Sequence, residues 1–439
     1  MNLTAPDQAA PPALAAGNVR RLLLALISQA QADLQRRGLI QQDQALASRS
    51  WDGDSDALDT IAIDEATLGF DSLSRLDLIN AVNQFFQLSR SGAEDYLLLT
   101  PTVGRWLEVV LQHLTIVGAD QHFGFATSGS MGPVSVHVHS LSDLEAEVAA
   151  LCEGPLCDLA GVKRILALVP PHHIYGFLFT CLLPKALSVE VVDLSRKAPS
   201  ALARVARPGD LVIGTPFSWD MVAKAGLPLV SGVCGITSAG PSTADTWDLA
   251  APGRPDAMIE IYGATETGGL GSRQSWNAPF DLLPHLVPLK DGIARSGAPM
   301  VPLAVQDHVI WQEPRRFSVQ GRRDQVVQVA GLNVQPGVVR EHILALDEVA
   351  DVAVRMGRDR LKAFVVPQPD VTDLPALQRT INTHLRKRFP ASACPGDLRF
   401  GSSLPRNTMG KLKDWDVGEP VSLPAIETQE KQIPANLVN

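Results

Sequence analysis

The sequence has few cysteines, no excess of positive charge and no long apolar run, and each absence excludes a class of protein. Five cysteines, scattered between Cys152 and Cys394, form neither a disulfide framework nor a paired CxxC zinc site, so we expect reduced thiols. A formal net charge of −9 gives no broad basic surface for nucleic acid or anionic lipid. The most apolar stretch, IYGFLFTCLLP, contains Gly176 and Pro184 and is well short of the ~20 residues that span a bilayer. We therefore expect a cytoplasmic protein without a transmembrane segment, whose partners are small molecules or proteins.

The length of 439 residues and the 45% hydrophobic content predict two or three globular domains. Residues 1–17, rich in Ala, Pro and Gln, are predicted to be a flexible leader. Helical periodicity in NVRRLLLALISQAQADLQRRG and LGFDSLSRLDLINAVNQFF, followed by two shorter helical segments, predicts a helical bundle over residues 18–115. In the second of these helices, one buried face is expected to contain Leu73, Leu76, Ile79, Val82 and Phe86.

After residue 116 the pattern changes to apolar runs typical of strands, such as VKRILALVP, SVEVVDL and GDLVIGTP, which alternate with helical or turn segments. This alternation predicts an α/β core domain over residues 116–320. The charged segment QGRRDQ then precedes a strand–helix–strand pattern, which predicts a small α+β lid domain over residues 321–418. Residues 419–439, rich in Pro, Glu and Gln, are predicted to be a mobile tail. The expected fold class is α/β.

Serine and glycine are concentrated in the segment TSGSMG. Its glycines let the backbone turn sharply, and Thr127, Ser128 and Ser130 offer hydroxyl and N–H groups to phosphate oxygens. No lysine follows the second glycine, so this is not the GxxxxGK[ST] loop of kinases and GTPases. A Ser/Gly cluster is also an ordinary turn, and other segments must decide between the two interpretations.

A second candidate is IEIYGATETGG, residues 259–269. Thr265 and Glu266 follow a strand-like run here, on a loop with enough glycine for close backbone approach. A carboxylate beside a threonine hydroxyl at a strand end fits a site for Mg²⁺ and phosphate. The segments PPHHIYGF, GRRDQVVQVAGLNVQP and LPRNTMGKLKDW complete the set of conspicuous patterns.

These segments resemble the adenylate-forming superfamily of acyl-CoA synthetases, peptide-synthetase adenylation domains and luciferases. TSGSMG resembles its phosphate loop, PPHHIYG its PxxHxxG segment, YGATE its YGxTE motif and LPRNTMGK its LPRxxxGK motif. Asp307 lies fifteen residues before Arg322 of QGRRD, matching the TGD aspartate and the GRxD arginine of the family. The resemblance implies a shortened adenylate-forming fold that converts a carboxylic acid into an acyl-adenylate. The product would pass to the thiol of CoA or of an acyl carrier protein.

Matched position by position, the resemblance implies a site for ATP and Mg²⁺. Glu266 would bind the metal, Thr265 would contact the α-phosphate, and Lys411 would bridge the phosphate and the substrate carboxylate, where negative charge develops. Asp307 and Arg322 would hold the ribose hydroxyls. The full set of nucleotide-binding positions is Thr127, Ser128, Gly129, Ser130, Gly132, Tyr262, Gly263, Thr265, Asp307 and Arg322.

The resemblance also implies an acid pocket, a hinge and a thiol-arm tunnel. Its spacing selects His173 rather than His172 for the pocket, which would also contain Tyr175, Gly240 and Ala264. The small residues of SAGP, 238–241, would leave room for a flat ring or would form a plain turn. Asp324 matches the hinge, and the VVQVAGLNV strand with Gly331 would face the pantetheine arm.

Two other features suggest sites that the family does not require. His137 and His139 point the same way on a predicted strand, but without a third ligand we expect surface or interface histidines rather than a metal pair. LGFDSL resembles the DSL motif of acyl carrier proteins, in which the serine carries phosphopantetheine. On that interpretation Ser72 is the attachment point; alternatively, Asp71 or Ser72 caps a helix.

A carrier-like segment before a short ligase resembles the ligases of xanthomonadin and aryl polyene pigment clusters. That resemblance implies a small aromatic acid such as 3- or 4-hydroxybenzoate, and an acyl carrier protein as partner. The sequence departs from the superfamily in two respects: Val134-Ser135 replaces the usual PK of the phosphate loop, and the helical bundle replaces an α/β subdomain. These departures leave two alternatives open, a non-catalytic adenylation-fold scaffold and an enzyme that loads its own Ser72. The oligomeric state, including a homodimer, is also open.

Overall fold

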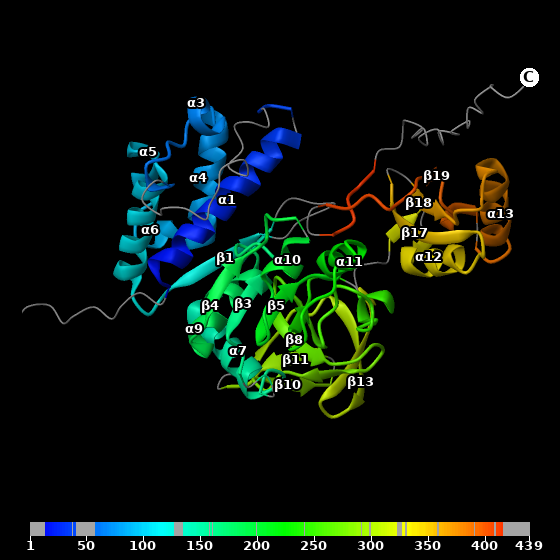
Figure 1. Ribbon diagram of the computed structural model, residues 1–439. Helices are drawn as coiled ribbons and strands as arrows, with labels where there is room; N and C mark the ends of the chain where they lie inside the picture. The colour runs from blue at the N-terminus through cyan, green and yellow to red at the C-terminus, as the bar shows by residue number, and fades with distance from the viewer. Residues whose placement is uncertain are drawn as a thin grey trace, which may run out of the picture. The chain divides into compact units, whose positions relative to one another are not determined.

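Figure 1 shows a computed structural model of the chain, coloured from the N-terminus to the C-terminus. It describes residues 14–36, 38–40, 58–126, 135–157, 159, 161–198, 200–240, 242–290, 292–297, 300–322, 327–329, 332–357, 360–389, 391–407 and 410–415.

The chain divides into two compact units. The larger one contains Met1–Val305, Val309–Val319 and Thr408–Lys411, and the smaller one contains Gln306–His308, Gln320–Asn407 and Leu412–Asn439. The domain boundaries predicted above concern which segments fold independently, and they stay predictions.

The N-terminal part of the larger unit is helical, as predicted. Its elements are α1 (Ala16–Arg36), α3 (Glu65–Leu68), α4 (Ser72–Phe86), η3 (Leu88–Arg90), α5 (Tyr96–Leu99) and α6 (Val103–Val117). The helix expected in LGFDSLSRLDLINAVNQFF is α4, and the short α3 before it ends at Leu68, where Gly69 adopts a left-handed φ of 78°. The Asp71 side chain then caps α4 by accepting the Ser74 N–H at 2.7 Å.

The buried face of α4 differs from the expected one. Leu73 and Leu76 are 69% and 46% exposed, so their predicted burial is wrong. Burial begins one turn later, and the buried residues are Leu78, Ile79, Val82, Phe85 and Phe86. The reason is tertiary, because the aromatic groups that α4 packs against lie beside its C-terminal end.

An aromatic cluster connects the helical segment to the α/β core. Phe85 of α4 lies 6.0 and 5.5 Å from Phe123 and Phe125 of β1 (His122–Ala126), measured between ring centroids. Phe177, which ends α8 (Ile174–Phe177), lies 4.8 Å from Phe123 and 6.1 Å from Phe85. The helices and the central sheet therefore share one hydrophobic core.

The core sheet has nine strands in the order β13-β14-β9-β8-β7-β6-β5-β3-β4. The five strands from β7 to β4 are parallel, whereas β8 and β9 continue the sheet in antiparallel pairing. In sequence order the strands are β3 (Arg164–Ala167), β4 (Glu190–Asp193), β5 (Asp210–Gly214), β6 (Cys234–Thr237), β7 (Ala257–Ala264), β8 (Gly268–Arg273), β9 (Phe280–Leu282), β13 (Asp307–Glu313) and β14 (Arg316–Arg322). The apolar runs predicted as strands are β3, β4 and β5. Ligands of open parallel sheets bind at the carboxyl ends of the strands, which places the expected site there.

Two smaller sheets and several helices complete the larger unit. An antiparallel hairpin pairs β1 with β2 (Val136–Ser140), and a second small sheet contains β10 (Leu286–Leu289), β11 (Gly292–Arg295) and β12 (Val301–Pro302). The helices are α7 (Leu141–Glu153), α8, η4 (Leu178–Leu182), α9 (Leu183–Leu187), α10 (Ser200–Val205), α11 (Pro216–Lys224) and η5 (Asp245–Trp247). None of the described helices is long and apolar enough to cross a membrane.

The smaller unit has the predicted α+β character and a hydrophobic core of its own. Its elements are β15 (Val327–Val329), β16 (Leu332–Val334), α12 (Pro336–Leu344), β17 (Val349–Met356), β18 (Leu361–Pro367), α13 (Leu374–Arg386), η7 (Ala391–Ala393) and β19 (Asp397–Phe400). The VVQVAGLNV segment, predicted as one strand, contains two, because β15 pairs antiparallel with β16. Gly331 and Asp324 lie outside the described residues.

Candidate active site

The candidate site is built around the turn between β7 and β8, which we call the YGATE turn, residues 264–269. Thr265, Glu266 and Thr267 form the turn, and the Thr267 N–H donates to the Ala264 carbonyl at 3.2 Å. Gly268 follows with a left-handed φ of 75°, as in three-residue hairpin loops. The turn lies at the carboxyl end of β7, and the Glu266 side chain is half-buried there.

The residues before the turn are held tightly. β7 has a bulge between Tyr262 and Gly263, and a side chain on Gly263 would collide with the Gly268 carbonyl. The Tyr262 ring lies 5.3 Å from Phe280 and 5.8 Å from Phe317, between centroids. The predicted positions Tyr262, Gly263, Ala264, Thr265 and Glu266 are therefore contiguous on one rigid hairpin.

Strand β2 and helix α7, which follow the predicted phosphate loop in the chain, contact both ends of the YGATE turn. His139 of β2 is 5% exposed, and its Nε2 lies 2.8 Å from the Thr265 carbonyl oxygen. Because a carbonyl only accepts, Nε2 carries the proton and donates. Glu147 of α7 is 3% exposed, and its Oε1 accepts the Gly269 N–H at 2.8 Å.

The expectation that His137 and His139 are surface or interface histidines is wrong for His139, which lies in the interior. His137 is half-buried, and its Nε2 lies 3.3 Å from the Ser135 hydroxyl. Among the described residues no group of three His, Cys, Asp or Glu could hold a metal. That these histidines are not a metal pair stays a prediction.

Burial changes the titration of both contact residues. It raises the pKa of Glu147 to about 7, although the Gly269 N–H and the charge of Arg295 oppose this effect. It also lowers the pKa of His139, so this imidazole stays neutral. Two buried groups that are uncharged or partly uncharged near neutral pH therefore hold the turn through hydrogen bonds.

The PxxHxxG loop, residues 170–176, lies after the carboxyl end of β3. The Tyr175 hydroxyl donates to the Gly214 carbonyl at 2.9 Å, so this predicted pocket residue fixes the loop to β5. His172 is 9% exposed, and neither ring nitrogen has a hydrogen-bond partner within the part of the chain that the structure describes. Burial, and to a smaller extent the neighbouring His173, lowers the pKa of His172 well below its usual value. The imidazole is therefore neutral.

Lys411 is brought to the same region of the larger unit as His173. The pKa of His173 falls to about 4 because of burial and the positive charge of Lys411. Gly410 adopts a left-handed φ of 74° and approaches Phe217 so closely that a side chain would collide with it. The segments PPHHIYG and LPRNTMGK are more than two hundred residues apart in the chain. Their residues His173 and Lys411 therefore come close together in the folded protein.

The SAGP segment has an unusual backbone. Ala239 has a left-handed φ of 68°, which is uncommon for a residue with a side chain. Ser238 is 7% exposed, and Gly240 is exposed with open space around it, while Pro241 lies outside the described residues. Strained backbone of this kind is concentrated at binding sites, which supports a ligand-facing role over a plain turn.

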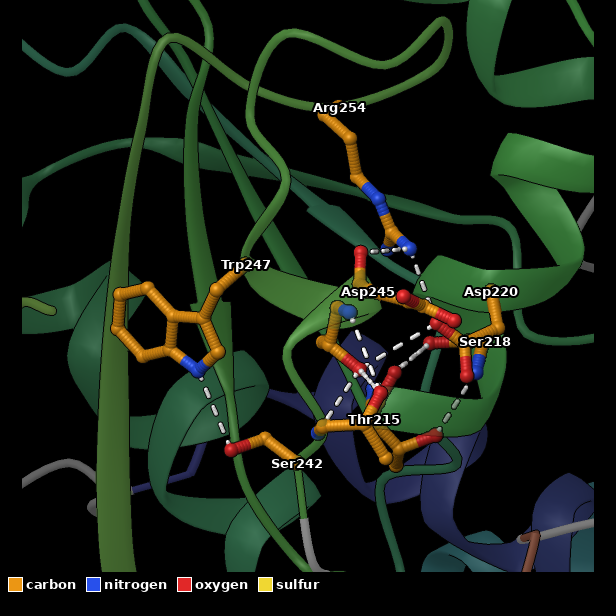
Figure 2. Close-up of polar contacts among 9 residues, drawn as sticks. Thr215, Ser218, Asp220, Ser242, Asp245, Trp247 and Arg254 are labelled. Atoms are coloured by element: carbon orange, nitrogen blue, oxygen red, sulfur yellow. Dashed lines mark hydrogen bonds and ion pairs between the residues drawn. The ribbon is translucent and has the colours of Figure 1, made fainter. Parts of the chain in front are cut away.

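A polar network holds the chain next to this segment (Figure 2). Arg254 Nη2 donates to Asp220 Oδ1 and to the Asp245 carbonyl, both at 2.9 Å, and Trp247 Nε1 donates to the Ser242 hydroxyl at 3.2 Å (Figure 2). At the start of α11, Thr215 and Ser218 form a capping box. These contacts fix the segments that follow β5 and β6, and no sequence motif indicated them.

The predicted ribose positions Asp307 and Arg322 both belong to the smaller unit. Asp307 begins β13 and Arg322 ends β14, and these neighbouring strands are connected only by Pro314 and Arg315. The first residue of one strand and the last of the other therefore lie at the same end of the hairpin. The phosphate-loop positions Thr127, Ser128, Gly129, Ser130 and Gly132 lie outside the described residues.

The carboxylate and hydroxyls of the YGATE turn fit a metal carried by a nucleotide. Mg²⁺ prefers oxygen ligands and is usually held by one or two carboxylates together with substrate phosphates and water. Glu266 supplies one such carboxylate, beside the Thr265 hydroxyl, and the described residues contain no larger cluster. The donor set fits Mg²⁺ bound to ATP.

The chain is similar to known proteins over most of its length. Residues 341–411 match the AMP-binding enzyme C-terminal domain family, and the match ends at Lys411. The chain is 39% identical over 397 residues to a 4-coumarate–CoA ligase of Cereibacter sphaeroides, covering 90% of this chain and 96% of the relative. It is 40% identical over 403 residues to a 4-coumarate–CoA ligase of Rhodobacter capsulatus, covering 91% and 100%. The fold matches ATP-bound MatB from Rhodopseudomonas palustris with a TM-score of 0.55 at 18% identity, over 89% of this chain and 91% of that one.

Proposed function

Since the chain belongs to the adenylate-forming acyl-CoA ligase family, we propose that it activates an aromatic acid of the 4-coumarate type with ATP and transfers it to CoA. The observation that carries this proposal is similarity over almost the whole length of proteins named 4-coumarate–CoA ligase. These relatives favour a hydroxycinnamate over the hydroxybenzoates that the pigment-ligase resemblance implied. The resemblance to the xanthomonadin and aryl polyene ligases stays a prediction.

The reaction has two steps. In the first, a carboxylate oxygen of the acid attacks the α-phosphorus of ATP, an acyl–phosphate bond forms, and pyrophosphate leaves. In the second, the CoA sulfur attacks the acyl carbon, the thioester forms, AMP leaves, and the thiol proton passes to solvent. Both steps develop negative charge on oxygen, so fixed positive charge and hydrogen-bond donors accelerate them.

In this proposal the candidate residues act mainly on the first step. Bound Mg²⁺ would neutralise the triphosphate, and the Glu266 carboxylate would hold it. Thr265 would orient the α-phosphate through its hydroxyl, and Lys411 would stabilise the charge shared by the phosphate and the carboxylate. The proximity of Lys411 to His173 supports a site at which these groups meet.

Two buried polar groups support the proposal that the aromatic ring of the acid carries a hydroxyl group. Among the described residues, neither ring nitrogen of His172 has a hydrogen-bond partner, and neither does the hydroxyl of Thr237, which is fully buried at the carboxyl end of β6. Buried polar atoms without partners are rare in folded proteins, and a ligand is one cause. A neutral imidazole can both donate to and accept from a phenol, so His172 is the group we propose for the ring hydroxyl.

The test is thioester formation with CoA across a panel of acids. We expect 4-coumarate to give the highest kcat/KM, ahead of cinnamate, 3- and 4-hydroxybenzoate and medium-chain fatty acids. A preference for fatty acids would contradict an aromatic substrate, and a preference for hydroxybenzoate would restore the earlier prediction. Absence of pyrophosphate release with every acid would favour the non-catalytic scaffold.

A carrier thiol is the second candidate acceptor. Ser72 is exposed at the first position of α4, and the exposed Leu73 and Leu76 follow it. Intact-mass measurement after incubation with a phosphopantetheinyl transferase tests this interpretation, with Ser72→Ala as the control. A mass increase of one phosphopantetheine group that the variant lacks would support self-loading, and an unchanged mass in both proteins would leave CoA as the acceptor.

A further inference from the structure

The YGATE turn is held at its two ends by side chains that come from one segment of the chain. His139 and Glu147 are eight positions apart, on β2 and on α7, which begins at Leu141 directly after β2. This segment follows the predicted phosphate loop in the chain. The two parts of the molecule assigned to the nucleotide phosphates and to the metal are thus joined through the β2–α7 segment.

The contact made by Glu147 is unusually close. Its Oε1 accepts the Gly269 N–H, and its Oε2 occupies the space into which a side chain on Gly268 would project. Glycine at 268 therefore allows both the left-handed turn and the approach of the carboxyl group. A residue whose purpose was only to fill the core would not need a carboxyl group at this position, where burial opposes its charge.

The contact made by His139 is equally specific. Its ring packs 5.9 Å from Phe125, between centroids, and its Nε2–H donates to Thr265, the residue next to Glu266. An apolar side chain would fill the same space and leave the Thr265 carbonyl without this donor. The two hydrogen bonds, both 2.8 Å long, connect the Thr265 carbonyl and the Gly269 N–H to the β2–α7 segment, and the Thr267 hydroxyl donates to the Gly268 carbonyl at 2.9 Å within the turn.

We propose that His139 and Glu147 are positioning residues that hold the YGATE turn, so that the Glu266 carboxylate is kept where it would bind Mg-ATP. This inference rests on the proposed function of Glu266 as the metal ligand. It adds two residues that no sequence motif of the nucleotide site includes. Neither residue touches the reacting atoms, and each acts through the turn.

The experiment compares two variants at each position. His139→Leu and Glu147→Leu remove the hydrogen-bonding group, whereas His139→Gln keeps an N–H donor and Glu147→Gln keeps an oxygen acceptor. Glu145→Leu is the matched control, because Glu145 lies on the same helix but is exposed. Three quantities are measured for each protein: Mg-ATP affinity by calorimetry without acid, acid-dependent pyrophosphate exchange, and thioester formation from supplied 4-coumaroyl-adenylate and CoA.

We expect each leucine variant to weaken Mg-ATP binding about tenfold, since the Thr265 carbonyl or the Gly269 N–H loses its hydrogen bond to a buried side chain. The glutamine variants should recover most of this loss, and the control should bind like wild type. Thioester formation from the supplied adenylate should change little in any variant, because this step does not use Mg-ATP. That contrast separates positioning from general structural damage.

Wild-type Mg-ATP affinity in both leucine variants would overturn the proposal, and so would equal losses in the two half-reactions. Failure of the proposed function has a different signature. If wild type binds Mg-ATP but forms no thioester with any acid, the proposed reaction is wrong, while the binding data still test the positioning. If wild type binds no Mg-ATP, both are wrong.

Discussion

The YGATE turn and the PxxHxxG loop occupy the same end of the sheet, but their buried polar groups differ. At the YGATE turn, His139 of β2 and Glu147 of α7 are hydrogen-bonded to the backbone of the turn. In the PxxHxxG loop, His172 is also buried, but neither of its ring nitrogens has a hydrogen-bond partner among the described residues. Paired groups of this kind fix a structure, whereas unpaired ones are available to a ligand. The comparison predicts that changes at the turn affect ATP and changes at the loop affect the acid.

The largest effect is expected at the turn itself. Glu266→Ala should reduce acid-dependent pyrophosphate exchange by roughly 10³-fold, because the charge of the metal–triphosphate group loses its protein ligand. The control is Glu145→Ala on the exposed face of α7. Undiminished exchange in Glu266→Ala would show that this residue does not bind the metal, and would contradict the assignment of the YGATE turn to ATP.

Lys411→Ala tests whether the two half-reactions depend on different groups. Losing one preorganised group that stabilises transition-state charge costs roughly 10²- to 10³-fold, and we expect this loss in adenylate formation. A supplied acyl-adenylate should still be converted to thioester at a near-normal rate. Equal losses in both steps would show that Lys411 acts in both, contrary to its predicted role.

His172→Phe should change the choice of acid with little effect on ATP. We expect the ratio of kcat/KM for 4-coumarate to that for cinnamate to fall about tenfold, since the proposed hydrogen bond to the phenol is lost. The KM for ATP should stay within a factor of about two of wild type. His122→Phe is the control, at the end of the β1–β2 hairpin away from residues 127–134. An unchanged ratio would mean that His172 does not face the ring hydroxyl.

A separate effect, on stability rather than on catalysis, comes from the raised pKa of Glu147. This pKa rises from 4.5 to about 7 on folding, so the favourable contribution of the protonated form is complete below pH 4.5 and is lost as the pH rises through 7. The full loss is about 3 kcal/mol, and Glu147→Gln, which stays neutral, avoids it.

Thermal unfolding of the ligand-free protein measures this difference. Glu147→Gln should be more stable than wild type at pH 8, and the difference should nearly vanish at pH 4.5. Arg295, whose charge reaches Glu147, is paired with Asp143 at 2.6 Å. The titratable or charged groups on the described elements packed against α7 are neutral or have partners of their own: His137, His139, Cys181, Lys185 and Arg273. A stability difference that does not depend on pH would contradict the raised pKa.

Much of the fold followed from local patterns. The helices of the N-terminal segment and the strands β3, β4 and β5 lie where periodicity and apolar runs predicted them. The exposed Leu73 and Leu76 show where this reasoning failed, because helical spacing identifies a face but not how far a neighbour covers it. Similarly, VVQVAGLNV has the composition of one strand, and only the pairing of β15 with β16 shows the reversal within it.

The sequence by itself determined which residues are capable of the chemistry, since Glu266, Lys411 and His173 stand in segments whose order is that of one enzyme family. The tertiary structure alone decided which groups support them. His139 was expected outside the core, His173 was selected over His172, and Glu147 carried no signal, because the burial and the partner of a side chain depend on segments far away in the chain. A carboxyl group on a helix and a glycine more than a hundred residues later become one contact only when the sheet has formed.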